Sequence, residues 1–173
     1  MEYVDLLLPP PSPLQTQALI FLLGSLTVSS LSDLRRLAAQ ADFAEVWAAF
    51  TAAMFLTDVY TGATGQLNIY AFTLKWTLIL LAAAFTSTTH LLNLSTMDTA
   101  ALAALLSTLT PAYILTTLIL TLIVNELLHP ILRKYGEAGA YPFLPTILTV
   151  NLLIILLQAA GGLEPYLSLA ETL

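Results

Sequence analysis

The sequence contains no cysteine and few charged residues. Of its 173 residues, 9% are charged, whereas 58% are hydrophobic. The lack of cysteine excludes a disulfide framework, thiolate metal ligands and a cysteine nucleophile. A soluble domain of this size carries charge on roughly 25% of its positions, so this chain has too little polar surface to face water on all sides. The composition therefore predicts a multi-pass membrane protein that is surrounded by lipid.

Basic residues are scarcer than acidic ones. The chain has 5 Lys and Arg against 11 Asp and Glu, which gives a formal net charge of -6. Nucleic-acid binding needs a basic surface that neutralises phosphates, so we expect no nucleic-acid partner. The chain opens with Met1-Glu2, and no small-residue cleavage site follows the first apolar run. We therefore expect no secretory signal peptide.

Six apolar segments are separated by proline, glycine or charged residues. About 20 helical residues cross roughly 30 Å of hydrocarbon, and helices inside a bundle can be somewhat shorter. A single kinked helix over 98–128 is an alternative to two helices that meet at Pro111. The predicted spans are Leu14–Leu31, Phe43–Tyr60, Leu67–His90, Asp98–Pro111, Ala112–Leu128 and Tyr141–Ala160.

The pattern predicts an all-α fold, a polytopic membrane helix bundle with about six transmembrane helices. One integral membrane domain covers residues 1–173. It divides into a proline-rich extracytoplasmic lead-in over 1–13, the bundle over 14–160 and a C-terminal tail over 161–173. Residues 32–42 are expected to form a short interfacial helix after the first span.

Four of the five basic residues fall in two of the predicted loops. Arg35 and Arg36 follow the first span, and Arg133 and Lys134 lie between the fifth and the sixth. Cytoplasmic loops retain Lys and Arg, and six spans place both pairs on one side, whereas five would separate them. We therefore expect a multi-pass protein of the plasma membrane with both termini outside.

Two aspartates lie at the predicted cytoplasmic ends of different spans. Asp33 follows the first span, and Asp98 opens the fourth, whose small residues permit close packing. Two carboxylates that approach within a few ångströms share a proton, so that one activates water while the other protonates the substrate. Peptide hydrolysis of this kind needs no cofactor or metal. The simpler alternative is a structural role, with Asp98 as the N-cap of its own helix.

The first aspartate segment resembles a known family motif. Ser32-Asp33-Leu34-Arg35-Arg36, after an apolar helix, resembles the first aspartate motif of the prepilin peptidases. These are intramembrane aspartyl proteases that include the archaeal preflagellin peptidases. Asp98, with the Ala-Leu-rich run 100–105 and Pro111, looks like the helix that carries their second aspartate. Residues 141–145, Tyr-Pro-Phe-Leu-Pro, look like the beginning of their last helix.

This resemblance implies that Asp33 and Asp98 are the catalytic pair. It implies a pilin-like precursor protein as substrate, with its leader peptide cut at the cytoplasmic membrane face. The second motif departs from the family pattern Gly-x-Gly-Asp, because the same four positions read Ser95-Thr96-Met97-Asp98. The turn Ile-Pro that usually follows the first motif is replaced by Leu37-Ala38. We expect no counterpart of the cysteine-bearing methylation domain of the bacterial members.

Two other functions stay open at this point. The first is a non-enzymatic membrane bundle, either an inactive relative or a structural subunit of a larger membrane complex, and a homo-oligomer is also open. The second is a metal-dependent membrane enzyme built on Glu126-x-x-His129 near His90. Bundle metal sites of this type repeat the motif on a second helix, so we interpret Glu126 and His129 as helix-end residues, with Pro130 ending the span.

Lys75 is the one charged residue predicted well inside a span. An intramembrane charge is a functional hypothesis by default. The alternatives are that Lys75 extends to the outer membrane surface or pairs with Asp58 near the end of the second span.

Overall fold

The computed structural model describes residues 6–9, 13–36, 41–88, 94–136 and 141–163. The described residues form helices and no strand, which confirms the all-α prediction. The helices are α2 (Pro13–Arg36), α3 (Ala41–Ala63), α4 (Ile69–Thr88), α5 (Thr96–Ser107), α6 (Pro111–Leu132) and α7 (Leu144–Ala159), with the 3-10 turn η1 (Arg133–Tyr135) after α6. Most of the predicted lead-in and tail lies outside the described residues.

The first helix is longer than predicted. Residues 32–36 continue α2 as far as Arg36, so they are not part of a separate interfacial helix. Neither glycine nor proline interrupts this segment, and its leucine and arginine residues favour helix formation. Residues 37–40 lie outside the described part of the chain, and α3 begins at Ala41. Asp33 is therefore a helical residue in the last turn of α2.

The segment from Asp98 to Leu128 forms two helices, as predicted. Helix α5 ends at Ser107, Thr110 is the N-cap of α6, and Pro111 occupies the first turn of α6. Proline fits there because the first N–H groups of a helix have no intrahelical partner. The prediction that Pro130 ends this span is wrong, because α6 continues to Leu132. Backbone hydrogen bonding continues beyond the proline, because the Arg133 N–H donates to the carbonyls of His129 and Ile131.

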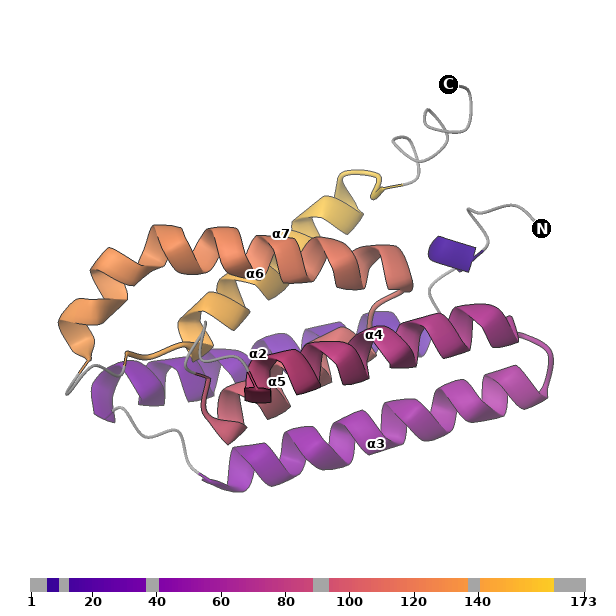
Figure 1. Cartoon of the computed structure of the whole chain (residues 1–173), viewed down its shortest axis with the longest axis horizontal. Coiled ribbons are helices and arrows are strands. Elements are labelled where there is room, and N and C mark those ends of the chain that lie inside the picture. The colour runs from indigo at the N-terminus through magenta and orange to yellow at the C-terminus, as the bar shows by residue number, and fades with distance from the viewer. Residues whose placement is uncertain (1–5, 10–12, 37–40, 89–93, 137–140, 164–173) are drawn as a thin grey trace.

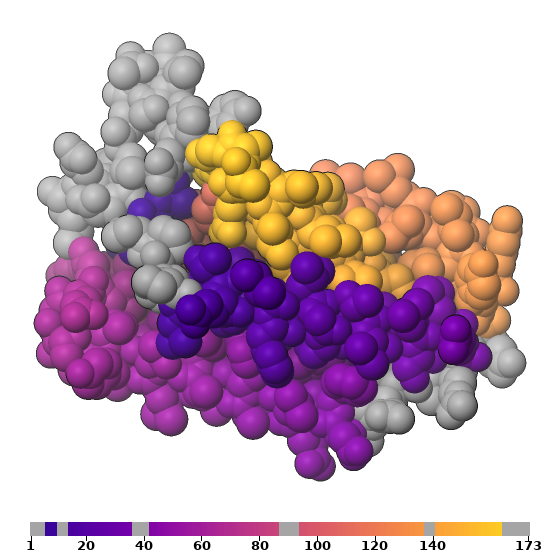
Figure 2. All heavy atoms as spheres, turned by 180° about the vertical axis from the view of Figure 1, so that it is seen from behind, coloured from indigo at the N-terminus to yellow at the C-terminus, as the bar shows by residue number. Residues whose placement is uncertain are grey.

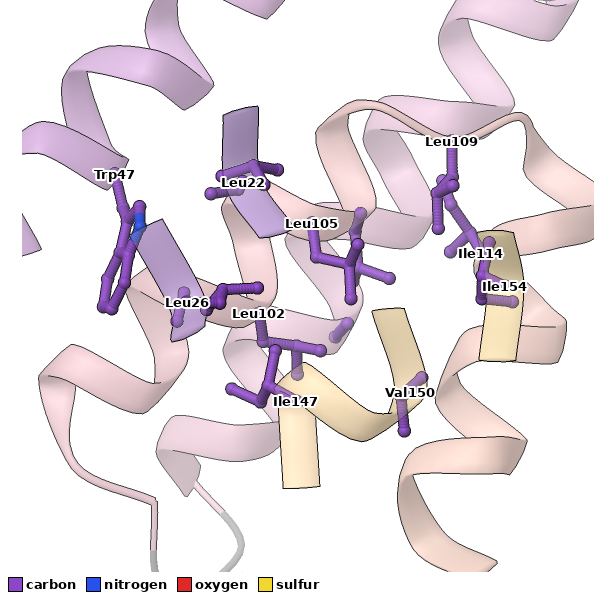
Figure 3. Close-up of a cluster of buried hydrophobic side chains, with 14 of the residues drawn as sticks. Leu22, Leu26, Trp47, Leu102, Leu105, Leu109, Ile114, Ile147, Val150 and Ile154 are labelled. Atoms are coloured by element: carbon purple, nitrogen blue, oxygen red, sulfur yellow. The ribbon is translucent and has the colours of Figure 1, made fainter. Parts of the chain in front are cut away.

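Helix α5 lies at the centre of the bundle (Figure 1). It packs chiefly against α3 and α4, while α7 packs along both α2 and α6. Leu105 of α5, Leu22 and Leu26 of α2 and Ile147 of α7 are all completely buried. Figure 3 shows these side chains converging from three helices on one cluster. Burial of this short helix on several sides explains why it is apolar all round.

Within the described part of the chain, three helices are long and apolar enough to cross a membrane. They cover Leu14–Arg35, Ile69–Thr86 and Pro111–Tyr135. Helices α5 and α7, with 12 and 16 residues, are shorter than the roughly 30 Å hydrocarbon core. Helix α3 has 23 residues, but it carries Asp42, Glu45 and Asp58. The structure therefore supports membrane association through three spans, a coarser result than the six that the sequence predicts.

Candidate functional site

The Asp33 side chain lies at the N-terminal end of α7. It is 8% exposed, and its carboxylate accepts hydrogen bonds from the backbone N–H groups of Phe143 and Leu144. Phe143 is the N-cap of α7 and Leu144 its first residue. The first N–H groups of a helix lack intrahelical partners and carry partial positive charge, so they stabilise a carboxylate there. The last turn of α2 is thereby joined to the beginning of α7.

Asp98 is held at the N-terminal end of α5 by Ser95. The backbone N–H and the hydroxyl of Ser95 donate to Asp98 Oδ2 at 2.9 and 2.7 Å. The Asp98 N–H donates back to Ser95 Oγ at 3.2 Å. This is a reciprocal capping box in which Ser95 is the N-cap and Asp98 the third residue of the helix. The prediction that Asp98 itself is the N-cap is therefore wrong.

The structure brings the two aspartates together. Asp33 comes from α2 and Asp98 from α5, and the negative charge of Asp98 acts on the Asp33 carboxylate. Burial raises the pKa of Asp98 above its ordinary value of 3.8, and the hydrogen bonds from Ser95 oppose this rise. Neighbouring carboxylates in a desolvated place influence each other's protonation.

Met97 stands where the prepilin peptidase pattern has glycine. The Met97 side chain is partly buried and packs against the hydrophobic core. The neighbouring Ala100 packs against the same core. The bundle therefore accommodates the larger residue by placing it among apolar neighbours.

An apolar groove opens over helix α5. Its volume is about 800 Å³, and it runs between α3 and α4 over the surface of α5. Thr96 and Thr99, from the same helical turn as Asp98, line the groove. Ala52 of α3 and Trp76 of α4 line it further along. Small residues on α3 and α5 keep the groove open for an apolar chain segment, and neither Asp33 nor Asp98 is among its lining residues.

A buried ion pair joins α3 and α4. Lys75 Nζ lies 2.7 Å from Asp58 Oδ2, with the two side chains 4% and 5% exposed. Trp76 Nε1 donates to the same carboxylate oxygen at 3.0 Å. The prediction that Lys75 pairs with Asp58 is confirmed, and its extension to the membrane surface is wrong. Asp58 compensates the charge of Lys75 locally, which gives Lys75 a structural role.

The residues of the metal hypothesis have other contacts. His129 lies edge-on to the Tyr141 ring with centroids 5.0 Å apart, and Tyr141 Oη donates to Asn125 Oδ1 at 3.0 Å. Glu126 is exposed, and His90 lies outside the described residues. Among the residues that the structure describes, no group of three His, Asp or Glu side chains is placed to hold a metal ion.

Two parts of this site were not predicted from the sequence. The capping box had a readable signal, because Ser95-x-x-Asp98 before an apolar run is a typical N-terminal signature. The N–H donors of Phe143 and Leu144 had no sequence signal, because almost every residue has a backbone N–H group whatever its side chain. Their contact with Asp33 depends on how α7 packs against α2.

Comparison with known proteins does not assign the chain to a family. No family model, no curated protein and no solved structure matches it.

Proposed function

We propose that this protein is an intramembrane aspartyl endopeptidase that resembles the prepilin peptidases. Asp33 and Asp98 are its catalytic pair. One observation carries the proposal: the charge of Asp98 on α5 acts on the carboxylate of Asp33 on α2. The shared motif Ser32-Asp33-Leu34-Arg35-Arg36 adds support.

The reaction needs only the two carboxyl groups and water. The ionised aspartate takes a proton from a water molecule, whose oxygen attacks the carbonyl carbon of the scissile peptide bond. The protonated aspartate gives its proton to the carbonyl oxygen, which forms a tetrahedral gem-diol. The proton taken from water then passes to the amide nitrogen as the C–N bond breaks, and one hydroxyl proton of the intermediate returns to the other aspartate. A carboxylic acid and an amine are released. General acid–base catalysis of this type contributes about 10²–10⁴-fold in rate.

The groove between α3 and α4 offers space for an apolar substrate segment. Its wall is mainly aliphatic and aromatic. A pilin-like precursor would place its apolar segment there. The exposed Arg35 next to this end agrees with a cytoplasmic position in the plasma membrane.

A cleavage assay tests the proposal. Membranes that contain the protein are incubated with a pilin-like precursor tagged at both ends, and the products are separated by size. We expect Asp33→Asn and Asp98→Asn each to reduce cleavage by at least about 100-fold. Asp42→Asn, at an exposed acid in the first turn of α3, is the matched control and should leave cleavage unchanged.

A non-enzymatic bundle is the second proposal. The structural roles of both carboxylates favour it, because Asp98 takes part in the capping box of α5 and Asp33 accepts hydrogen bonds from the beginning of α7. On this proposal the protein is an inactive relative or a subunit of a larger membrane complex. Cleavage by every form that does not exceed that of membranes without the protein would favour it.

A further inference from the structure

Helices α2 and α7 bury three polar side chains that lack a hydrogen-bond partner within the described part of the chain: Ser30, Thr146 and Asn151. Ser30 of α2 is 1% exposed and Asn151 of α7 is 0% exposed. Neither the Ser30 hydroxyl nor either atom of the Asn151 amide has a hydrogen-bond partner within the described part of the chain. The two helices pack side by side, as Figure 2 shows along the indigo and yellow segments. Buried polar atoms without partners are rare, so each one calls for an explanation.

The hydrogen bonds at Asp33 set the register of the two helices. Helices α2 and α7 run in opposite directions (Figure 1), and the N–H groups of Phe143 and Leu144 meet the Asp33 carboxylate. Ser30 precedes Asp33 by about one turn on the same helical face, roughly 4.5 Å further into the bundle. Asn151 follows Leu144 by about two turns on the same face, roughly 10 Å further in. Asp33, Ser30 and Asn151 therefore succeed one another from the end of this interface towards its interior.

The neighbouring Ser29 behaves differently. Its buried hydroxyl donates to the carbonyl groups of Ser25 and Leu26 in its own helix, at 2.9 and 3.2 Å. Helical serine and threonine hydroxyls commonly satisfy themselves in this way. Ser30 does not, so its hydroxyl is left for another partner.

We propose that ordered water occupies the α2–α7 interface, held by the Ser30 hydroxyl and the Asn151 amide and leading inward from Asp33. Water suits these groups because it both donates and accepts, as serine and asparagine also do. A metal cation fits less well, since the amide NH₂ group can only donate. The water hydrates Asp33 from the bundle interior, whether or not the aspartate pair cleaves peptides.

Thermal unfolding of matched variants in detergent tests this inference. We expect Ser30→Ala and Asn151→Leu each to lower the Tm by about 2–4 °C, because each removes a ligand of the water. The double variant should lose less than the sum of the two, since the first change already releases the water. Ser29→Ala is the matched control, and its effect should add to that of Asn151→Leu.

A dry interface would give the opposite pattern. Asn151→Leu would then raise the Tm, because it removes a buried amide without partners, and its effect would add to that of Ser30→Ala. If a variant does not fold, a second measurement distinguishes a hydrated interface from a dry one. An experimental structure of the unmodified protein should show water density within about 3.5 Å of Ser30 Oγ and of the Asn151 amide. Apolar contacts in its place would overturn the inference.

Discussion

The backbone N–H of Leu144 donates a hydrogen bond to the carboxylate of Asp33. Asp33 lies in the last turn of α2, and Leu144 is the first residue of α7. The end of the first long helix is thus anchored on the beginning of the last one. Any change that displaces the beginning of α7 should also displace Asp33.

Tyr141 tests this connection. Its hydroxyl donates to Asn125 Oδ1 of α6, which is 5% exposed, and thereby holds the segment just before Phe143. Tyr141→Phe leaves that buried acceptor unpaired, so we expect a loss of about 1–3 kcal/mol in the free energy of unfolding. Cleavage should fall with it, chiefly in kcat, because Asp33 is less well positioned. Thermal unfolding and steady-state kinetics provide the two readouts.

Tyr135→Phe is the control for that variant. It makes the same chemical change at a tyrosine whose side chain is 56% exposed in η1. Equal losses in the two variants would show that the Tyr141 hydrogen bond has no special part in holding α7.

Ser95 supports the other aspartate. Ser95→Ala removes the N-cap hydroxyl and one of the two Ser95 donors to Asp98 Oδ2. We expect a loss of about 1 kcal/mol, which corresponds to a fall in Tm of about 2–4 °C. Ser95→Thr keeps a hydroxyl and should restore most of the loss. If both substitutions had the same effect, the capping box would not stabilise α5.

The ion pair between α3 and α4 gives a third prediction. Asp58→Asn and Lys75→Met each leave one buried charge without its partner, at side chains 5% and 4% exposed. We expect each single variant to lose about 3–5 kcal/mol and the double variant to lose clearly less than either. Asp42→Asn, at an exposed acid of α3, should change the Tm little. Additive losses in the double variant would contradict a coupled pair.

The raised pKa of Asp98 gives a pH dependence with a definite sign. Burial raises this pKa above 3.8, so the folded protein holds the Asp98 proton more tightly than the unfolded chain does. The stabilisation by this proton is present at low pH and is lost as the pH rises through the raised pKa. Asp98→Asn is always neutral, so its Tm relative to the unmodified protein should improve from about pH 4 to pH 7. A constant difference in Tm would contradict the shift.

Much of the fold could be predicted from local sequence signals. Pro111 marks the beginning of a new helix, because its missing N–H is tolerated only in the first turn. The Lys75–Asp58 pair could be predicted because an unpaired charge inside an apolar helix is so unfavourable. The number of spans could not, since α5 and α7 are short helices whose burial depends on their neighbours.

The candidate site could be predicted only in part. The positions of Asp33 and Asp98 at the ends of apolar segments suggested a pair, and the structure places the two charges in interaction. The donors from Phe143 and Leu144 arise from tertiary packing, which no local pattern encodes. The extension of α2 past Leu31 was missed because the amphipathic pattern of residues 32–42 suggested a separate interfacial helix, although helix propensity favours continuity.

Cross-linking of engineered cysteines tests the pairing of Asp33 and Asp98 most directly. The natural chain has no cysteine, so Asp33→Cys with Asp98→Cys creates a unique pair. We expect a short bifunctional thiosulfonate to cross-link this pair efficiently in native membranes. The control pair, Asp33→Cys with Thr64→Cys, has its second cysteine beyond the far end of α3 and should not be cross-linked. Equal cross-linking of the two pairs, in variants with the same Tm, would contradict a catalytic pair formed by Asp33 and Asp98.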